Sequence, residues 1–198
     1  MNPAIKKALF LGYDAKQTTA IQALQERNCL VEHSSEPLTT CPTYDFAISF
    51  GYRHILKKET IRSLGCPIFN LHISFLPFNR GAHPSFWSLY DNTPNGVTIH
   101  LIDEGVDTGP IIAQQRVLIP DSADTFEKAH RLLIKSLEGL FLDNVDTIIS
   151  GNWSATPQQG LGSHHFINDL PTNFSGWNAN IKKELSKLRK EGLRYERN

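Results

Sequence analysis

The chain has 198 residues, of which 40% are hydrophobic and 20% charged, and its 20 Lys and Arg residues balance its 20 Asp and Glu residues. This length and composition are typical of one globular domain with a small appendage, which can bury a core without disulfides or a structural metal. The zero net charge argues against a general binder of nucleic acid or of anionic membranes.

The three cysteines, Cys29, Cys41 and Cys66, are widely spaced and form no Cys-x-x-Cys pair. Their spacing argues against a disulfide framework and a thiolate zinc site, and it fits a reducing compartment. The amino-terminal segment has too short an apolar run for a secretory signal, and no segment approaches a membrane span. We therefore expect a cytoplasmic protein with no membrane partner.

The amino-terminal part of the sequence predicts a parallel α/β sheet. Apolar runs predict strands at Lys6–Gly12, Cys29–His33, Asp45–Gly51 and Ile68–Ile73, and helices are expected at Asp14–Asn28 and Lys57–Leu64. Asp14 is placed to cap the first helix. The order strand, helix, strand implies parallel pairing. The first turn has a single glycine, Gly12, and therefore lacks the glycine-rich dinucleotide fingerprint.

The remaining sequence predicts a short helix, two strands and a long helix. The short helix is expected at Pro84–Tyr90, and the strands at Val97–Ile102 and Ile111–Ile119. Asp124 and Glu127 resemble a capping box, and apolar residues at spacings of three and four predict a helix that ends near Gly151.

The sequence after Gly151 changes character. It is rich in Gly, Ser, Gln, Asn and Pro from Trp153 to Gly176, which predicts an irregular tail lying over the domain, and Lys182–Arg194 predicts a basic helix. We therefore predict a domain at residues 1–151 and a carboxy-terminal extension at residues 152–198 that packs on it.

Polar residues follow two of the apolar runs. Asn70 and His72 are two residues apart at the end of one strand, so both side chains face the same side and can hydrogen-bond an oxygen on which charge develops during acyl transfer. Asp107 follows the second run, and a carboxylate beside an imidazole favours its protonated form and fixes its tautomer. Because open α/β sheets carry their chemistry at strand ends, we expect these two ends to face each other and form one active site.

Spacing alone leaves simpler interpretations open. In these, Asn70 satisfies loop backbone, His72 is a half-buried core residue and Asp107 caps a turn. Asp103 and Glu104 are better explained as solvated loop charges, since their backbones are as important as their side chains.

Other chemistries have weaker support. A metal site on His100 and the acidic residues of the following loop matches no defensible ligand spacing, and His164 and His165 read as surface residues. The chain has no G-x-S-x-G motif and no cysteine beside a histidine, so a covalent nucleophile is not expected.

Two motifs resemble the folate-dependent formyltransferase family. They are N-L-H-x-S-x-L-P-x-x-R-G (Asn70 to Gly81) and G-V-T-I-H-x-I-D-E-G-V-D-T-G (Gly96 to Gly109). The family includes glycinamide ribonucleotide formyltransferase, methionyl-tRNA formyltransferase and the sugar-nucleotide N-formyltransferases, and the resemblance covers about Lys6 to Gly151. It implies an α/β, Rossmann-like formyltransferase fold, with a mostly parallel twisted sheet flanked by helices and a short irregular and helical tail.

The resemblance also implies a reaction and its residues. A formyl group passes from 10-formyltetrahydrofolate to a primary amine through a tetrahedral intermediate, without a metal. Asn70, His72 and Asp107 would be the catalytic triad: Asn70 and His72 polarise the formyl oxygen, while Asp107 holds His72 protonated and assists proton removal from the amine.

The resemblance further implies where the two substrates bind. The pterin would contact, largely through backbone groups, Tyr52, Arg53, His54, Ile55, Leu56, Ile102, Asp103, Glu104 and Val106. Candidates for contact with the acceptor are Gly12, Tyr13, Arg80, Phe86 and Trp87. The alternative for Phe86 and Trp87 is that they are core residues of a short helix.

The segment R-G-A-H-P-S-F-W-S-L (Arg80 to Leu89) and the polar tail resemble small formyltransferases of the pseudaminic-acid type, which act on nucleotide-linked 4-amino sugars and imply a role in surface polysaccharide biosynthesis. Only 47 residues follow Gly151 and the net charge is zero, so we expect no tRNA acceptor and no nucleic-acid partner. Two alternatives stay open: glycinamide ribonucleotide or another small amine as acceptor, and a catalytically idle folate- or nucleotide-binding module. The oligomeric state also stays open, with a homodimer among the options.

Overall fold

The structure, a computed structural model, describes residues 5–39 and 42–194. The described chain forms two compact units. The first comprises the described residues of Met1–His72, Thr98–Gln114 and Leu137–Gln158, and the second those of Ile73–Val97, Gln115–Ser136 and Gln159–Asn198. These units do not follow the predicted boundary at Gly151, and the division into a catalytic domain and an extension stays a prediction. Cys41, and the outermost residues of both predicted domains, lie outside the described residues.

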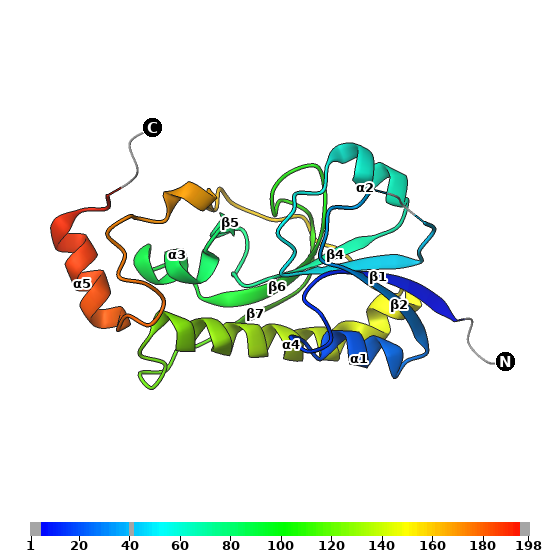
Figure 1. Ribbon diagram of the computed structural model, residues 1–198, viewed down its shortest axis with the longest axis horizontal. Coiled ribbons are helices and arrows are strands. Elements are labelled where there is room, and N and C mark those ends of the chain that lie inside the picture. Colours follow the sequence, from blue (N-terminus) through cyan, green and yellow to red (C-terminus); the bar gives the residue numbers. More distant parts are fainter. Residues whose placement is uncertain (1–4, 40–41, 195–198) are drawn as a thin grey trace. The chain divides into compact units, whose positions relative to one another are not determined.

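Within the described residues, a six-stranded sheet has the strand order β2-β1-β3-β4-β6-β7 (Figure 1). Its strands are β1 (Lys6–Gly12), β2 (Cys29–Ser34), β3 (Phe46–Phe50), β4 (Ile68–His72), β6 (Gly96–Leu101) and β7 (Ile111–Arg116). Strand β1 is parallel to β2 and β3, and β3 is parallel to β4, whereas β6 is antiparallel to β4. The predicted α/β fold with a mostly parallel sheet is confirmed.

The first unit contains most of this sheet and covers both of its faces. Strand β3 is buried at every residue, as expected for a parallel strand between two helical layers. Helix α2 (Lys58–Leu64) lies on one side, while α1 (Ala20–Gln25) and the carboxy-terminal half of α4 (Phe126–Ser150) lie on the other (Figure 1). A hydrogen bond of 2.7 Å from Thr18 Oγ1 to Glu138 Oε1 ties the start of α1 to α4.

Helix α1 begins at Ala20 instead of the predicted Asp14. The Asp14 carboxylate accepts hydrogen bonds from the backbone N–H groups of Lys16 (2.8 Å) and Gln17 (3.1 Å). These bonds close a local turn, which competes with helix formation over the same residues.

The predicted cap of α4 is also corrected. Thr125 Oγ1 accepts the backbone N–H of Lys128 at 3.2 Å, whereas Asp124 forms an ion pair with the Lys128 side chain. The helix thus starts one residue later than a box between Asp124 and Glu127 requires, and the threonine takes the capping position.

Strand β7 ends at Arg116 rather than Ile119. The next backbone N–H, that of Val117, donates to the carbonyl of Asn95 at 3.0 Å, and Pro120 has no N–H to continue a ladder.

The second unit is built around α3 (Pro84–Tyr90), the amino-terminal half of α4 and α5 (Ile181–Glu191). Its core contains Phe86, Trp87, Phe126 and Leu188. The tail is more regular than predicted: β8 (His164–His165) pairs with β5 (Arg80–Gly81), and a short 3-10 helix follows at Ile167–Asp169. Elements of two or three residues are too short to leave a periodic signal in the sequence. None of the helices in the described part of the chain is long and apolar enough to cross a membrane.

Candidate active site

The three predicted catalytic residues meet inside the first unit. Asn70 Nδ2 lies 3.1 Å from Asp107 Oδ1, and His72 Nδ1 lies 3.6 Å from Asp107 Oδ2. The carboxylate therefore faces both groups, with one oxygen toward each. The side chains of His72 and Asp107 are only 9% and 14% exposed, so water screens their interaction weakly.

The route by which these residues meet differs from the prediction. Because β6 is antiparallel to β4, the carboxy-terminal ends of the two strands point in opposite directions and do not face each other. Instead, Asn70 lies opposite His100 across the ladder, and the loop after β6 folds back over this pair. A backbone hydrogen bond of 2.9 Å from Leu101 to Pro110 closes the two ends of that loop.

His100 belongs to this network and was not among the predicted catalytic residues. It is 1% exposed, with Nδ1 2.8 Å from the carbonyl of Leu101 and Nε2 3.1 Å from Asn70 Nδ2. Because a carbonyl can only accept, Nδ1 carries a hydrogen; in that tautomer Nε2 can accept from Asn70, and it also lies 3.5 Å from Asp107 Oδ1. The cross-strand register of β4 and β6 would have identified it, but the sequence does not give the direction of β6.

The Asn70 side chain uses both of its N–H groups in this network. One donates to Asp107 Oδ1 and the other to His100 Nε2, each at 3.1 Å. Reversing the amide would place its oxygen against a carboxylate, so the network fixes the orientation. The carbonyl oxygen Oδ1 is then the atom of this amide that remains for a substrate.

The Asp107 loop is held from two directions. Asp103 Oδ1 accepts hydrogen bonds from the Gly105 backbone (3.0 Å) and the Thr108 hydroxyl (2.6 Å). From the other direction, Gln158 Nε2 donates to the carbonyls of Asp107 and Gly109, both at 2.8 Å. Sequence reasoning missed Gln158, because a single glutamine in a polar tail has no distinguishing pattern.

The first predicted pterin stretch is the loop between β3 and α2. Arg53 and His54 are exposed and Ile55 is 81% exposed, whereas Leu56 packs against a hydrophobic cluster that includes Leu11 and Ile68.

Tyr52, at the start of the same loop, is partly buried. Its hydroxyl donates to the carbonyl of Glu36 at 2.9 Å, and burial raises the pKa of the phenol. The tyrosine therefore helps to fix the loop.

The second predicted stretch borders the same cluster, through Ile102. Glu104 pairs with Lys58 at 2.5 Å and Arg62 at 3.3 Å, and the hydrogen bond from Lys58 lowers the pKa of this carboxylate. Val106 is exposed. Since the acidic side chains of this loop already have protein partners, a ligand here would meet backbone groups and apolar side chains.

Two predicted acceptor contacts, Gly12 and Tyr13, belong to the first unit. Gly12 has φ of +106°, and a Cβ there would lie 2.1 Å from the carbonyl of Phe50, so only glycine fits. The Tyr13 ring packs edge-on against Phe50 at 4.9 Å. Both residues have a structural role, and their contact with an acceptor stays a prediction.

The other three belong to the second unit. Arg80 pairs through its backbone N–H with the carbonyl of Ser163 at 3.0 Å. Phe86 is fully buried, and Trp87 is 3% exposed and stacks on His165 at 4.0 Å. This burial favours the alternative interpretation of Phe86 and Trp87 as core residues.

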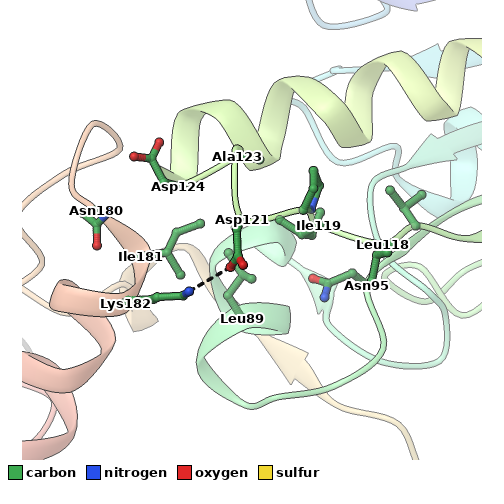
Figure 2. A pocket seen from close by; sticks show the side chains of 12 residues that line it. Leu89, Asn95, Leu118, Ile119, Asp121, Ala123, Asp124, Asn180, Ile181 and Lys182 are labelled. Carbon is green, nitrogen blue, oxygen red and sulfur yellow. Dashed lines mark hydrogen bonds and ion pairs between the residues drawn. The ribbon is translucent and has the colours of Figure 1, made fainter.

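A cavity of about 420 Å³ lies in the second unit, and none of the predicted catalytic or pterin-contacting residues lines it (Figure 2). Apolar side chains such as Leu89, Ile119 and Ile181 line it, and the ion pair between Asp121 and Lys182 (2.8 Å) lies at its side. In the part of the chain that the structure describes, no group of three or more His, Cys, Asp or Glu side chains is arranged to hold a metal ion.

Comparisons with known proteins agree with the motifs. A family model described as formyl transferase matches residues 14–140. A methionyl-tRNA formyltransferase of Thermodesulfovibrio yellowstonii is 37% identical over 146 residues, which are 73% of this chain and 47% of that protein. A dTDP-4-amino-4,6-dideoxyglucose formyltransferase of Mycobacterium tuberculosis is 32% identical over 150 residues, 76% of this chain and 56% of that protein. The chain thus spans about half the length of the curated relatives it matches.

A solved structure is similar over almost its whole length. It is the formyltransferase PseJ from Anoxybacillus kamchatkensis in complex with UDP-4,6-dideoxy-4-formamido-L-AltNAc and tetrahydrofolate. It is 34% identical with a TM-score of 0.81, and the match covers 91% of this chain and 98% of that one. From its fold, its motifs and the matching family model, the chain belongs to the formyl transferase family.

Proposed function

We propose that the protein transfers a formyl group from 10-formyltetrahydrofolate to the primary amine of a nucleotide-linked 4-amino-4,6-dideoxy sugar. The observation that carries the proposal is the network of Asn70, His72 and Asp107, with separations of 3.1 and 3.6 Å. The choice of acceptor is supported by the likeness to PseJ, whose complex contains a UDP-linked 4-formamido sugar and tetrahydrofolate.

The reaction replaces the bond between the formyl carbon and the folate nitrogen by a bond to the acceptor amine, through a tetrahedral adduct whose oxygen carries negative charge. In this proposal, His72 stabilises the negative charge on this oxygen. Protonated beside Asp107, its imidazole can donate a hydrogen bond to the developing charge, and largely buried surroundings strengthen that interaction.

In this proposal, Asn70 orients the attacking amine. Because both of its N–H groups are committed to Asp107 and His100, its Oδ1 is suited to accept a hydrogen bond from the attacking amine. Such a bond would direct the lone pair of the amine nitrogen toward the formyl carbon. The earlier expectation, that the Asn70 amide polarises the formyl oxygen, requires it to release one of its present partners.

Asp107 links the two groups. Its Oδ2 faces His72 and its Oδ1 faces Asn70, so one carboxylate both favours the imidazolium and orients the amide. As the nearest base, it can also receive the proton that the amine loses on attack, directly or through water.

The two loops fit a folate. Leu56 and Ile102 pack on one hydrophobic cluster, with Ile55 and Val106 exposed nearby. Apolar side chains beside backbone donors and acceptors suit a flat heterocycle with polar edges. We therefore propose that residues 52–56 and 102–106 bind the pterin, mainly through their backbones.

The compartment and the assembly stay predictions: a cytoplasmic location, no nucleic-acid partner, and an oligomeric state with a homodimer among the options. The likeness to a methionyl-tRNA formyltransferase makes tRNA the acceptor to exclude by experiment.

The test is to incubate the protein with 10-formyltetrahydrofolate and four kinds of acceptor. These are UDP- and dTDP-linked 4-amino-4,6-dideoxy sugars, glycinamide ribonucleotide, a simple primary amine and methionyl-tRNA. We expect tetrahydrofolate and a formylated product, identified by mass spectrometry, only with a nucleotide-linked amino sugar. Turnover with another acceptor would reassign the substrate, and folate binding without turnover on any of them would leave a binding module. Asn70→Ala and His72→Ala should each lower turnover at least 100-fold without unfolding the protein.

A further inference from the structure

The Asp107 loop has a backbone conformation that needs support. Asp107 has φ of +52°, in the left-handed region. A non-glycine residue in that region is strained, and such conformations persist only where the surroundings hold them. The same residue must place its carboxylate between Asn70 and His72, so its backbone conformation sets the geometry of the catalytic network.

Gln158 supplies that support from a distant part of the sequence. Its Nε2 lies 2.8 Å from the carbonyl oxygens of both Asp107 and Gly109. Two carbonyls can only accept, so the NH₂ group of this side chain must face them, and both of its hydrogens are used. The glutamine thereby fixes the carbonyl of Asp107 itself and that of the second residue after it.

The segment that carries Gln158 is itself anchored in the first unit. Trp153 packs edge-on against Phe69 of β4 at 5.4 Å. Thr156 and Ile111 exchange two backbone hydrogen bonds of 2.8 Å, which add this segment to the start of β7. Gln158 follows two residues later, so it reaches the loop from a fixed backbone and not from a free tail.

We propose that Gln158 is a positioning residue for formyl transfer, which acts by holding Asp107 in its left-handed conformation. Without its two hydrogen bonds, Asp107 can relax toward negative φ, and its Cα–Cβ bond then turns away from Asn70 and His72. A displacement of about 1 Å in a catalytic group can cost roughly 100-fold in rate. The proposal rests on the proposed function, because it assigns a role in that same site.

The test uses Gln158→Met, which keeps the length of the side chain but removes both donors. We expect kcat to fall about 10- to 100-fold, while the KM for the acceptor and the affinity for tetrahydrofolate change less than about threefold. Gln159→Met, the same change at an exposed neighbour, is the matched control and should retain wild-type rates. A kcat for Gln158→Met within twofold of wild type would overturn the proposal.

A double-mutant cycle separates positioning from general destabilisation. If Gln158 acts only through Asp107, then adding Gln158→Met to Asp107→Ala, which leaves no side-chain oxygen to position, should change single-turnover rates less than about twofold. If the rate reductions of the two single variants instead multiply in the double variant, Gln158 acts independently of Asp107 and the proposal is refuted.

One readout does not need an acceptor, so the two proposals can fail separately. Asp107 lies 3.6 Å from His72 Nδ1 and 3.5 Å from His100 Nε2, so ring ¹⁵N NMR of both histidines reports the position of its carboxylate. We expect both rings to shift in Gln158→Met and neither in Gln159→Met. If no acceptor is formylated but these shifts appear, the proposed substrate fails and the role of Gln158 stands. Unchanged shifts overturn that role in either case.

Discussion

The carboxylate of Asp107 offers the sharpest test of the site. Asp107→Asn keeps the shape of the side chain, and its amide oxygen can still accept the hydrogen bond from Asn70. What it removes is the negative charge that lies 3.6 Å from His72 Nδ1. The variant therefore separates charge from geometry.

The size of the effect follows from this distance. At 3.6 Å and an effective dielectric of about 20, one carboxylate stabilises an imidazolium by about 4.6 kcal/mol. If His72 must be protonated when charge develops on the formyl oxygen, the loss corresponds to roughly 2,000-fold in kcat. Folate affinity should change less than about threefold, because the proposed pterin contacts are backbone groups of other residues.

The assay measures tetrahydrofolate release under saturating donor and acceptor, together with donor binding by calorimetry. Asp143→Asn is the matched control, since it removes the same charge from an exposed position on α4. A fall in kcat of less than tenfold for Asp107→Asn would refute the view that this carboxylate sustains a catalytic imidazolium. A large loss of folate affinity would show instead that the loop itself had been disturbed.

Two further predictions concern stability. Gly109→Ala should lower the free energy of unfolding by about 2 kcal/mol or more in urea titrations, because its Cβ would lie 1.8 Å from the backbone carbonyl of Leu101. Gly139→Ala, in α4 with nothing within 4 Å of its Cβ, should instead stabilise by about 0.5–1 kcal/mol, and equal effects would contradict the packing argument. Burial raises the pKa of Glu184, but hydrogen bonds, including that from Lys187, outweigh it and lower the pKa below 4.5. The stability that Glu184 contributes is therefore present above pH 4.5 and is lost as the pH falls through the lower, folded-state pKa. In Glu184→Gln, the free energy of unfolding should consequently fall less steeply as the pH is lowered below 4.5. An unchanged slope would count against this interaction.

The main elements of the fold could be predicted because they depend on local patterns. Buried parallel strands such as β1 and β3 are continuous apolar runs, and α4 shows a helical apolar period over several turns. Helix α1 was predicted too long because the turn at Asp14 uses side-chain hydrogen bonds to the backbone, which a periodic pattern does not show.

The predicted catalytic residues came from the family motifs, and the residues that contact them could not be predicted in the same way. Alternation of apolar and polar residues in β6 predicts a strand but gives no direction, so His100 could not be placed opposite Asn70. Gln158 was missed for a second reason: its role depends on the backbone pairing of Thr156 with Ile111, a contact between segments far apart in the sequence.

The antiparallel strand explains the spacing of the two motifs. Asn70 and His72 of β4 face Thr98 and His100 of β6 in register, and in each strand the two residues are two apart, so these four side chains share one face. A shift of one residue in either strand would turn its polar pair to the other face and leave buried donors and acceptors without partners. The polar groups of Thr98 and His100 are indeed satisfied, the former by Gln114 Nε2 at 2.9 Å and the latter by a backbone carbonyl. The candidate active site is therefore a polar patch on the face of the sheet at the carboxy-terminal end of β4, completed by a loop that folds back over it.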